Sequence, residues 1–342
     1  MIAPKNIPAF HQSLLAWYRH QGRDFPWRRA HDAYAILVSE VMLQQTQAGA
    51  VVPYYIRWLR RFPTIRCLAR AAEADVLRAW QGLGYYSRAR NLHRCAKLIV
   101  ENFGGILPSD PNELKSLPGI GRYTANAIAV FAFNQPLPLV EANTGRVLAR
   151  LCNVRDPIDS SSGQRKVWEA SAKLVPRKPA RDFQNAMMDL GSLICAARNP
   201  RCRTCPVQKF CRARNPGSLP RKRKRAAMIP LIESHRFCRI GDALLLEQSR
   251  QRWQGMWILP PLKLDGFKPS SLSRPIHTSV FPFTNHRVTL RVYRQQAHQI
   301  DHRVQRWFRK EELDAIPIPP PHRRTIDHLF NGAQATQPPR HQ

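Results

Sequence analysis

Apolar residues recur at helical spacing through the first half of the chain. Between Ala9 and about Leu193, segments carry apolar residues at helical spacing, such as Ile36, Val38 and Val41, and Pro and Gly residues separate these segments. This pattern predicts an all-helical fold for the first half of the protein.

The second half has a different pattern. The short runs ALLLEQ, GMWILP, VTLRVY and VQRWFRK have the composition of β-strands and are broken by turn residues. Before them, NPGSLP and RKRKR read as a charge-rich connector. We therefore predict a helical domain over residues 1–215, a basic linker at 216–229, a smaller α+β domain at 230–330 and a disordered tail at 331–342.

Charge narrows the class of partner. The 342 residues suffice for two domains, and 54 Lys and Arg against 23 Asp and Glu give a formal charge of +31. Such an excess indicates a polyanionic partner, DNA or RNA first. The N-terminus lacks a signal-type apolar core and no apolar run is long enough for a bilayer, so we expect a cytoplasmic protein.

Four of the eight cysteines form a compact array. Residues 195–211 read CAARNPRCRTCPVQKFC, a C-x6-C-x2-C-x5-C spacing. Four thiolates suit either Zn(II) or a [4Fe–4S] cluster, and ligand softness does not decide between them. A reducing compartment argues against disulfides, so we interpret the scattered remainder as buried thiols: Cys67, Cys95, Cys152 and Cys238.

Three short motifs point to chemistry, and each has a plainer explanation. Gly119 and Gly121 in LPGIG permit a turn whose amides face a phosphate, or merely connect two helices. Glu40 lies among apolar residues, where burial would raise its pKa and favour a general acid; the alternative is an exposed helix edge. Glu141 precedes a helix start and Asn143, so it is a cap, a catalyst or both.

Taken together, the motifs resemble a known family. LPGIGRYTANAI, SEVMLQQTQ, QGLGYYSRARNLH, FQNAMMDLGSLIC and the cysteine spacing are similar to the helix-hairpin-helix DNA glycosylases with an iron–sulfur loop, and best to the adenine DNA glycosylases of MutY type. The resemblance covers residues 8–212 densely and 230–328 loosely. It implies a [4Fe–4S] cluster held by Cys195, Cys202, Cys205 and Cys211. It also implies a monomeric, nucleoid-associated enzyme acting on double-stranded DNA with adenine opposite 8-oxoguanine or guanine.

The resemblance assigns the catalytic roles. Glu40 would protonate the flipped adenine at N7, and Glu141 would stabilise the oxocarbenium-like sugar that remains. Family members usually have Asp-Gly-Asn where this chain has Glu141, Ala142 and Asn143, so the carboxylate reaches one methylene further, which bears on the rate. Asn143 matches a supporting amide. Tyr123 stands where bifunctional lyases carry a nucleophilic Lys, which implies a monofunctional glycosylase.

Several DNA contacts follow from the same comparison. Gln45 resembles a residue inserted near the orphaned base, and Leu83 and Tyr85 resemble a wedge that holds the kinked duplex open. For Leu83, core packing is an equal alternative. Arg28 matches a position lining the adenine pocket. Asn185 replaces the Gln or Glu that the family commonly uses to read adenine, which leaves base selectivity open.

The C-terminal domain resembles the Nudix-like module that recognises 8-oxoguanine in these enzymes. GDALLLE begins like the hydrolase box, but no Arg-Glu-x-x-Glu follows Glu247, so pyrophosphate hydrolysis is not expected. Thr284, Asn285 and His286 occupy the recognition loop, which often reads Phe-Ser-His in the family. Thr284 keeps a hydroxyl, and Asn285 or His286 supplies a second donor, unless the segment is only a strand turn.

Two further functions are compatible with the sequence. Asn185 keeps open a glycosylase for another mispaired base, such as thymine opposite guanine. The replacement at Glu141 and Ala142 keeps open a lesion-binding protein whose chemistry has decayed, although the retained carboxylate argues against it.

Overall fold

The computed structural model describes residues 6–224, 227–262, 274–296 and 300–332. The chain forms two compact units. The first combines Met1–Arg70 with Asn91–Arg225, and the second combines Ala71–Arg90 with Ala226–Gln342. In the described residues, no helix is long and apolar enough to span a membrane.

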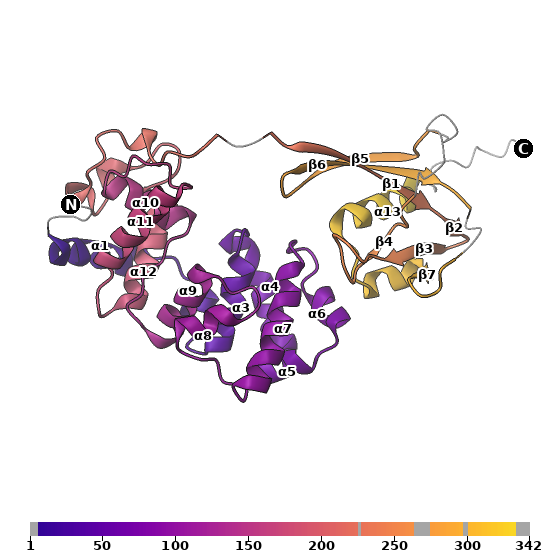
Figure 1. The fold of residues 1–342 in the computed structure, drawn as a ribbon, viewed down its shortest axis with the longest axis horizontal. Coiled ribbons are helices and arrows are strands. Elements are labelled where there is room, and N and C mark those ends of the chain that lie inside the picture. Colours follow the sequence, from indigo (N-terminus) through magenta and orange to yellow (C-terminus); the bar gives the residue numbers. More distant parts are fainter. Residues whose placement is uncertain (1–5, 225–226, 263–273, 297–299, 333–342) are drawn as a thin grey trace, which may run out of the picture. The chain divides into compact units, whose positions relative to one another are not determined.

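The described part of the first unit is helical, as the apolar periodicity predicts (Figure 1). The helix α7 (Ser87–Asn102) enters it from the second unit, and a π-helical turn (Leu190–Ile194) follows its last α-helix. The remaining helices are α1 (Ile7–Gln21), α2 (Pro26–Arg29), α3 (Ala33–Leu43), α4 (Ala48–Arg61), α5 (Ile65–Arg70), α8 (Pro111–Ser116), α9 (Arg122–Phe133), α10 (Ala142–Leu151), α11 (Ser161–Leu174) and α12 (Ala180–Asp189).

Helix α3 lies at the centre of this unit. The carboxylate of Asp32 caps its start by accepting hydrogen bonds from the backbone N–H groups of Tyr34 and Ala35. Helix α3 carries apolar residues on all its sides, and every residue from Tyr34 to Met42 is buried. A helix of this kind needs neighbouring elements around it to shield it from water, and α4 and α9 pack against α3.

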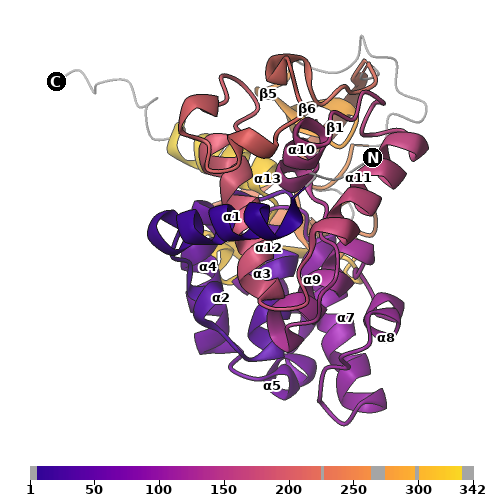
Figure 2. The ribbon, with the colours of Figure 1, turned by 90° about the vertical axis from the view of Figure 1, so that its left-hand side faces the viewer.

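A second part of the helical core is built where α1 packs against α12, as Figure 2 shows. Phe10 on α1 makes edge-to-face contacts with Phe183 on α12 and with Phe210, at centroid distances of 6.3 and 5.8 Å. Because Phe210 belongs to the cysteine-rich loop, this contact attaches the loop to the core.

The second unit contains two sheets. In one, β1 (Ile229–Phe237) runs parallel to β6 (His286–Arg294), which pairs antiparallel with β5 (His277–Phe283). In the other, β3 (Ala243–Gln248) pairs antiparallel with β2 (Arg239–Ile240), β4 (Trp257–Ile258) and β7 (Gln305–Arg309). The apolar faces of both sheets and helix α13 (Pro320–Gly332) share one core that includes Leu246, Leu290 and Ile326. A short helix, α6 (Glu73–Ala79), also belongs to this unit.

The boundaries differ in detail from those expected. Residues 71–90, predicted as part of the first domain, group with the second unit, where Arg78 Nη1 donates to the carbonyl of Ala315 at 3.2 Å. The first part of the predicted linker is not a solvated chain, because Leu219 is buried and the backbone N–H of Arg223 donates to Asp159. Helix α13 continues to Gly332, beyond the predicted start of the tail, and residues 333–342 lie outside the described residues.

Candidate active site

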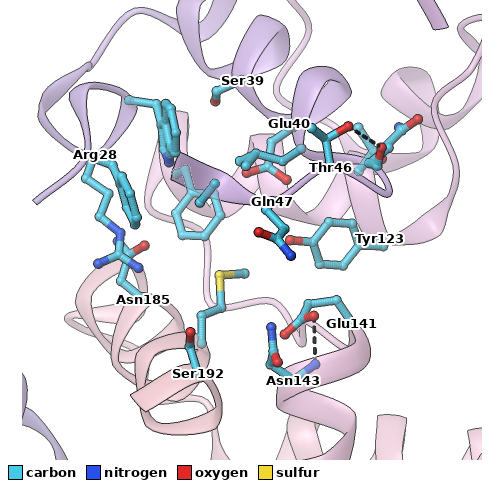
Figure 3. Close-up of a pocket in the computed structure, with 18 of the residues that line it drawn as sticks. Arg28, Ser39, Glu40, Thr46, Gln47, Tyr123, Glu141, Asn143, Asn185 and Ser192 are labelled. Carbon is cyan, nitrogen blue, oxygen red and sulfur yellow. Dashed lines mark hydrogen bonds between the residues drawn. The ribbon is translucent and has the colours of Figure 1, made fainter. Parts of the chain in front are cut away.

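A cavity of about 1080 Å³ opens in the helical unit. Its walls come from α2, α3, α9, α10 and α12 and from the loop that follows α3. Figure 3 shows Glu40, Tyr123, Glu141 and Asn143 around this cavity, with Arg28 and Asn185 at the other side. Segments far apart in sequence therefore bring the four proposed catalytic residues together.

Glu40 is a buried carboxyl at the cavity wall. It is only 5% exposed, and its pKa is raised to about 7 by burial, which disfavours the charged form. The hydroxyl of Tyr123 interacts with the Glu40 carboxylate and opposes this rise, whereas the nearby charge of Glu141 adds to it. A substantial protonated fraction of Glu40 therefore exists near neutral pH.

Glu141 is both the cap of α10 and a wall of the cavity. One carboxylate oxygen accepts from the backbone N–H of Asn143 at 2.7 Å, and the other accepts from that of Thr144 at 2.8 Å. In return the Thr144 hydroxyl accepts from the N–H of Glu141 at 2.9 Å, completing a capping box. Burial raises the pKa of Glu141, and the two backbone donors with Arg146 and Arg23 oppose the rise.

Arg146 connects the catalytic wall to the cysteine-rich loop. Its Nη2 donates to Asn143 Oδ1 at 2.9 Å and to the carbonyl of Gly191 at 2.6 Å, and its Nε donates to the carbonyl of Cys195 at 2.8 Å. A Cβ at Gly191 would lie 2.8 Å from Cβ of Asn143, so only glycine permits this approach. Arg146 was not identified from the sequence, although its position three residues after Asn143 on a helix was a usable signal.

Arg28 lines the cavity, but its guanidinium is already engaged. Nη1 and Nη2 donate to the two oxygens of the fully buried Asp189 at 2.7 and 2.9 Å, and Arg23 binds the same carboxylate. Beside them the rings of Phe25 and Trp27 stack with centroids 4.9 Å apart. Asp189 and these rings were not identified from the sequence, since nothing local links α2 to α12.

The remaining cavity residues lie as follows. Asn185 is buried on α12 and lines the cavity, together with Gly121 at the start of α9 and Gln45. Gln47 also lines it and was not singled out from the sequence; Figure 3 shows it beside Tyr123.

Gly119 occupies a position that requires glycine. It has a φ of +77°, and an added Cβ would lie 2.8 Å from Cβ of Asn91. The turn of LPGIG is closed by a hydrogen bond from the N–H of Ile120 to the carbonyl of Leu117, and Gly119 and Gly121 are exposed just before α9.

Backbone strain coincides with three predicted DNA contacts. In the described residues, Gln45, Tyr85 and Thr284 are the non-glycine residues other than asparagine with a left-handed φ, at +57°, +49° and +54°. Such a φ is uncommon for bulky or β-branched residues, and strained positions cluster at functional sites. Tyr85 is 50% exposed, whereas Leu83 is buried, so the surface feature of that segment is the tyrosine.

The cysteine-rich loop folds beside this unit's core. All eight cysteines of the chain are free thiols, and Cys195, Cys202, Cys205 and Cys211 are partly buried. Burial and, to a smaller extent, the other three thiols of the loop raise the pKa of Cys205 to about 11, while a backbone hydrogen bond from Val207 opposes the rise. Among the described residues, no group of three or more His, Cys, Asp or Glu side chains is arranged to hold a metal ion.

In the second unit, Thr284 and Asn285 form an exposed two-residue turn between β5 and β6. The first pair of the ladder joins Phe283 to His286, which is partly exposed. The carbonyl of Asn285 accepts from the N–H of Ile229 at 2.9 Å, which attaches the turn to β1.

The helical unit is similar to proteins of base-excision repair. Residues 38–176 match the family model described as the HhH-GPD superfamily base excision DNA repair protein. A solved structure of a thermostable thymine-DNA glycosylase aligns with a TM-score of 0.54 at 29% identity, covering 60% of this chain and 95% of that one.

Curated relatives narrow the class further. Adenine DNA glycosylase of Mycolicibacterium smegmatis is 44% identical over 205 residues, which is 60% of this chain and 69% of that protein. The rat adenine DNA glycosylase is 44% identical over 218 residues, 61% of this chain, although the match spans only 42% of the rat protein. The chain belongs to the adenine DNA glycosylase family, as its motifs predict.

Proposed function

We propose that this protein hydrolyses the N-glycosidic bond of adenine mispaired with 8-oxoguanine or guanine in double-stranded DNA. The observation that carries the proposal is the pair of carboxyls in one cavity with different environments. Burial gives Glu40 a pKa of about 7, while two backbone donors hold the carboxylate of Glu141. Such a difference suits Glu40 to act as a general acid and Glu141 to act as the anion that stabilises positive charge.

The chemistry then follows from these two positions. Protonated Glu40 donates its proton to N7 of the flipped adenine, and the glycosidic bond breaks with its electrons going to the base. The carboxylate of Glu141 stabilises the positive charge that develops on the sugar, and a water molecule adds its hydroxyl to C1′ while its remaining proton passes to the carboxylate that Glu40 has become. Tyr123 orients Glu40 and offers no amine, so the reaction is hydrolysis without a Schiff base.

Adenine is the proposed base because of the relatives and the shape of the pocket. The curated relatives at 44% identity are adenine DNA glycosylases, whereas the thymine-DNA glycosylase structure is 29% identical. The stacked rings of Phe25 and Trp27 provide an aromatic wall for a flat base, and Asn185 provides an amide to read its edge.

The cysteine loop suits a [4Fe–4S] cluster. Cys195, Cys202, Cys205 and Cys211 are four thiols at the family's spacing, and Phe210 packs the loop on the core. A cluster bound there would tie the four positions together and hold the loop folded. Because Arg146 donates to both the carbonyl of Cys195 and Oδ1 of Asn143, a loop held in place would also hold the side chain of Asn143 in place.

In this proposal the second unit recognises the base opposite adenine, which is 8-oxoguanine or guanine. The exposed turn at Thr284 and Asn285, followed by His286, carries a hydroxyl, an amide and an imidazole on the hairpin of β5 and β6. These donors suit the altered edge of 8-oxoguanine, and the strained φ of Thr284 supports a functional role.

Single-turnover release of adenine from an 8-oxoguanine:adenine duplex tests the proposal, with wild type and Glu141→Gln compared at equal iron content. Release by wild type that is lost in the variant supports it. Release of thymine from a guanine:thymine duplex alone would assign a different base. Tight binding without any release would indicate a lesion-binding protein.

A further inference from the structure

The loop before α7 carries the exposed ring of Tyr85 on a strained backbone. Tyr85 has a φ of +49° and is 50% exposed, and two glycines that precede it, Gly82 and Gly84, have φ values of +100° and +70°. A left-handed φ is unfavourable for a bulky residue and persists only where neighbouring groups hold the backbone. Neighbouring groups must therefore fix the backbone at Tyr85.

Arg88 holds both peptide planes that flank Tyr85. Its Nη2 donates to the carbonyls of Leu83 and Gly84 at 3.0 and 3.1 Å, and the indole Nε1 of Trp80 donates to the same Gly84 carbonyl at 3.0 Å. The backbone N–H of Arg88 donates to the carbonyl of Tyr85 at 2.9 Å. Rotation of the peptide between Gly84 and Tyr85 would relieve the strained φ, but it would break the two hydrogen bonds to the Gly84 carbonyl.

Aromatic rings also place the guanidinium of Arg88. Arg88 is only 7% exposed, and its guanidinium carbon lies 5.2 Å from the ring centroid of Trp80 and 5.5 Å from that of Tyr85. Burial lowers the pKa of Arg88 to about 10, so the side chain is still charged at neutral pH. A planar guanidinium can stack on rings while it donates to carbonyls, which compensates for the loss of water. Arg88 therefore connects the exposed Tyr85 ring to the buried Trp80.

We propose that Arg88 positions Tyr85 to unstack the duplex beside the mispair, while Arg88 itself stays buried. This inference rests on the proposed function, because it needs a duplex from which one base is extruded. An aromatic ring that enters a base step must offset the loss of base stacking. A ring that is ordered before binding does so more easily, because no further ordering opposes its insertion. Arg88 is thus a positioning residue that acts through Tyr85.

Fluorescence of 2-aminopurine tests this role in the full chain. The probe base is placed next to 8-oxoguanine in a duplex whose opposing adenine carries a 2′-fluoro sugar, which resists cleavage, and the probe brightens when it unstacks. Binding of wild type should raise the fluorescence. Arg88→Lys keeps the charge but loses the planar fork, so at saturating protein it should reduce this rise at least about 2-fold and slow adenine release from the cleavable duplex about 10-fold.

A double-mutant cycle separates positioning from general stability. Tyr85→Ser removes the ring and should reduce both signals by itself. Adding Arg88→Lys to Tyr85→Ser should then change each signal less than about 2-fold, because the ring that Arg88 positions is already absent. Arg94→Lys is the matched control, since Arg94 is exposed on α7 and its replacement should give wild-type fluorescence and release. Thermal unfolding verifies that each variant is folded, and Trp80→Phe, which removes the other donor to Gly84, repeats the test if Arg88→Lys does not fold.

Two results would overturn the inference. One is wild-type fluorescence from folded Arg88→Lys, and the other is an equal effect of Arg88→Lys with and without the Tyr85 ring, which would make the role of Arg88 purely structural. The proposed function fails separately. If wild type brightens the probe in a manner that depends on Arg88 but releases no adenine, adenine excision is refuted and the inference stands. If wild type releases adenine but Tyr85→Ser leaves the fluorescence unchanged, only the inference is refuted.

Discussion

Replacing Glu40 by glutamine should stabilise the protein at alkaline pH while removing its activity. Burial raises the pKa of Glu40 from 4.5 to about 7. Below pH 4.5 the carboxyl is protonated in both the folded and the unfolded chain, and the stability due to its burial is fully present. As the pH rises through about 7, the unfolded chain binds fewer protons than the folded one, and that stability is lost.

The magnitude follows from the two pKa values. One pKa unit corresponds to about 1.4 kcal/mol, so the interval from 4.5 to about 7 corresponds to at most about 3.5 kcal/mol. Glutamine at this position has nearly the same shape and does not ionise. Glu40→Gln should therefore exceed wild type in free energy of unfolding by up to about 3.5 kcal/mol at about pH 8.5, and the difference should vanish below pH 4.5.

Urea unfolding of the full chain at both pH values measures this difference. Glu169→Gln is the control, because Glu169 is exposed on α11 and its replacement should change the unfolding midpoint little at either pH. The same Glu40→Gln protein should release adenine at least about 100-fold more slowly, since it has no proton to donate. If the variant is no more stable than wild type at alkaline pH, the raised pKa of the buried Glu40 carboxyl is refuted. If the variant releases adenine at a near-normal rate, the role of Glu40 as general acid is refuted.

Three other outcomes are expected. Adenine release by wild type should fall as the pH rises past about 7, where Glu40 loses its proton, while duplex binding persists; a rate still rising at about pH 9 would contradict this assignment. Arg146→Gln should slow release about 10-fold by freeing Asn143, and Arg146→Lys should recover part of it; if stopped-flow rates are unchanged, Asn143 is held by other contacts. Cys211→Ser should lower the iron bound per chain in a colorimetric assay, and unaltered iron content would remove Cys211 from the ligand set.

Local patterns predicted what depends on local physics. The helical first unit follows from apolar spacing, and the burial of Glu40 follows from a helix whose residues are apolar on every side. The cap at Glu141 was equally visible, because a carboxylate before a helix start meets free backbone N–H groups.

Contacts between distant segments were not predictable in this way. The charge pairing of Arg28 with Asp189 joins residues 161 positions apart, and the parallel pairing of β1 with β6 joins the two ends of a long intervening segment. Neither leaves a periodic trace in the sequence. For the same reason a cavity in the second unit, lined by His235 on β1 and His322 on α13, was not predicted from the sequence.

The question raised by Glu141 is answered by how its longer side chain is used. An aspartate at a helix start has little length to spare, whereas Glu141 turns back so that both oxygens meet backbone N–H groups at 2.7 and 2.8 Å. Each oxygen retains a lone pair, so capping does not consume the negative charge. Burial raises the pKa of both carboxyls, but only Glu141 has two backbone N–H donors that oppose the rise, so capping is what separates the environments of the two carboxyls.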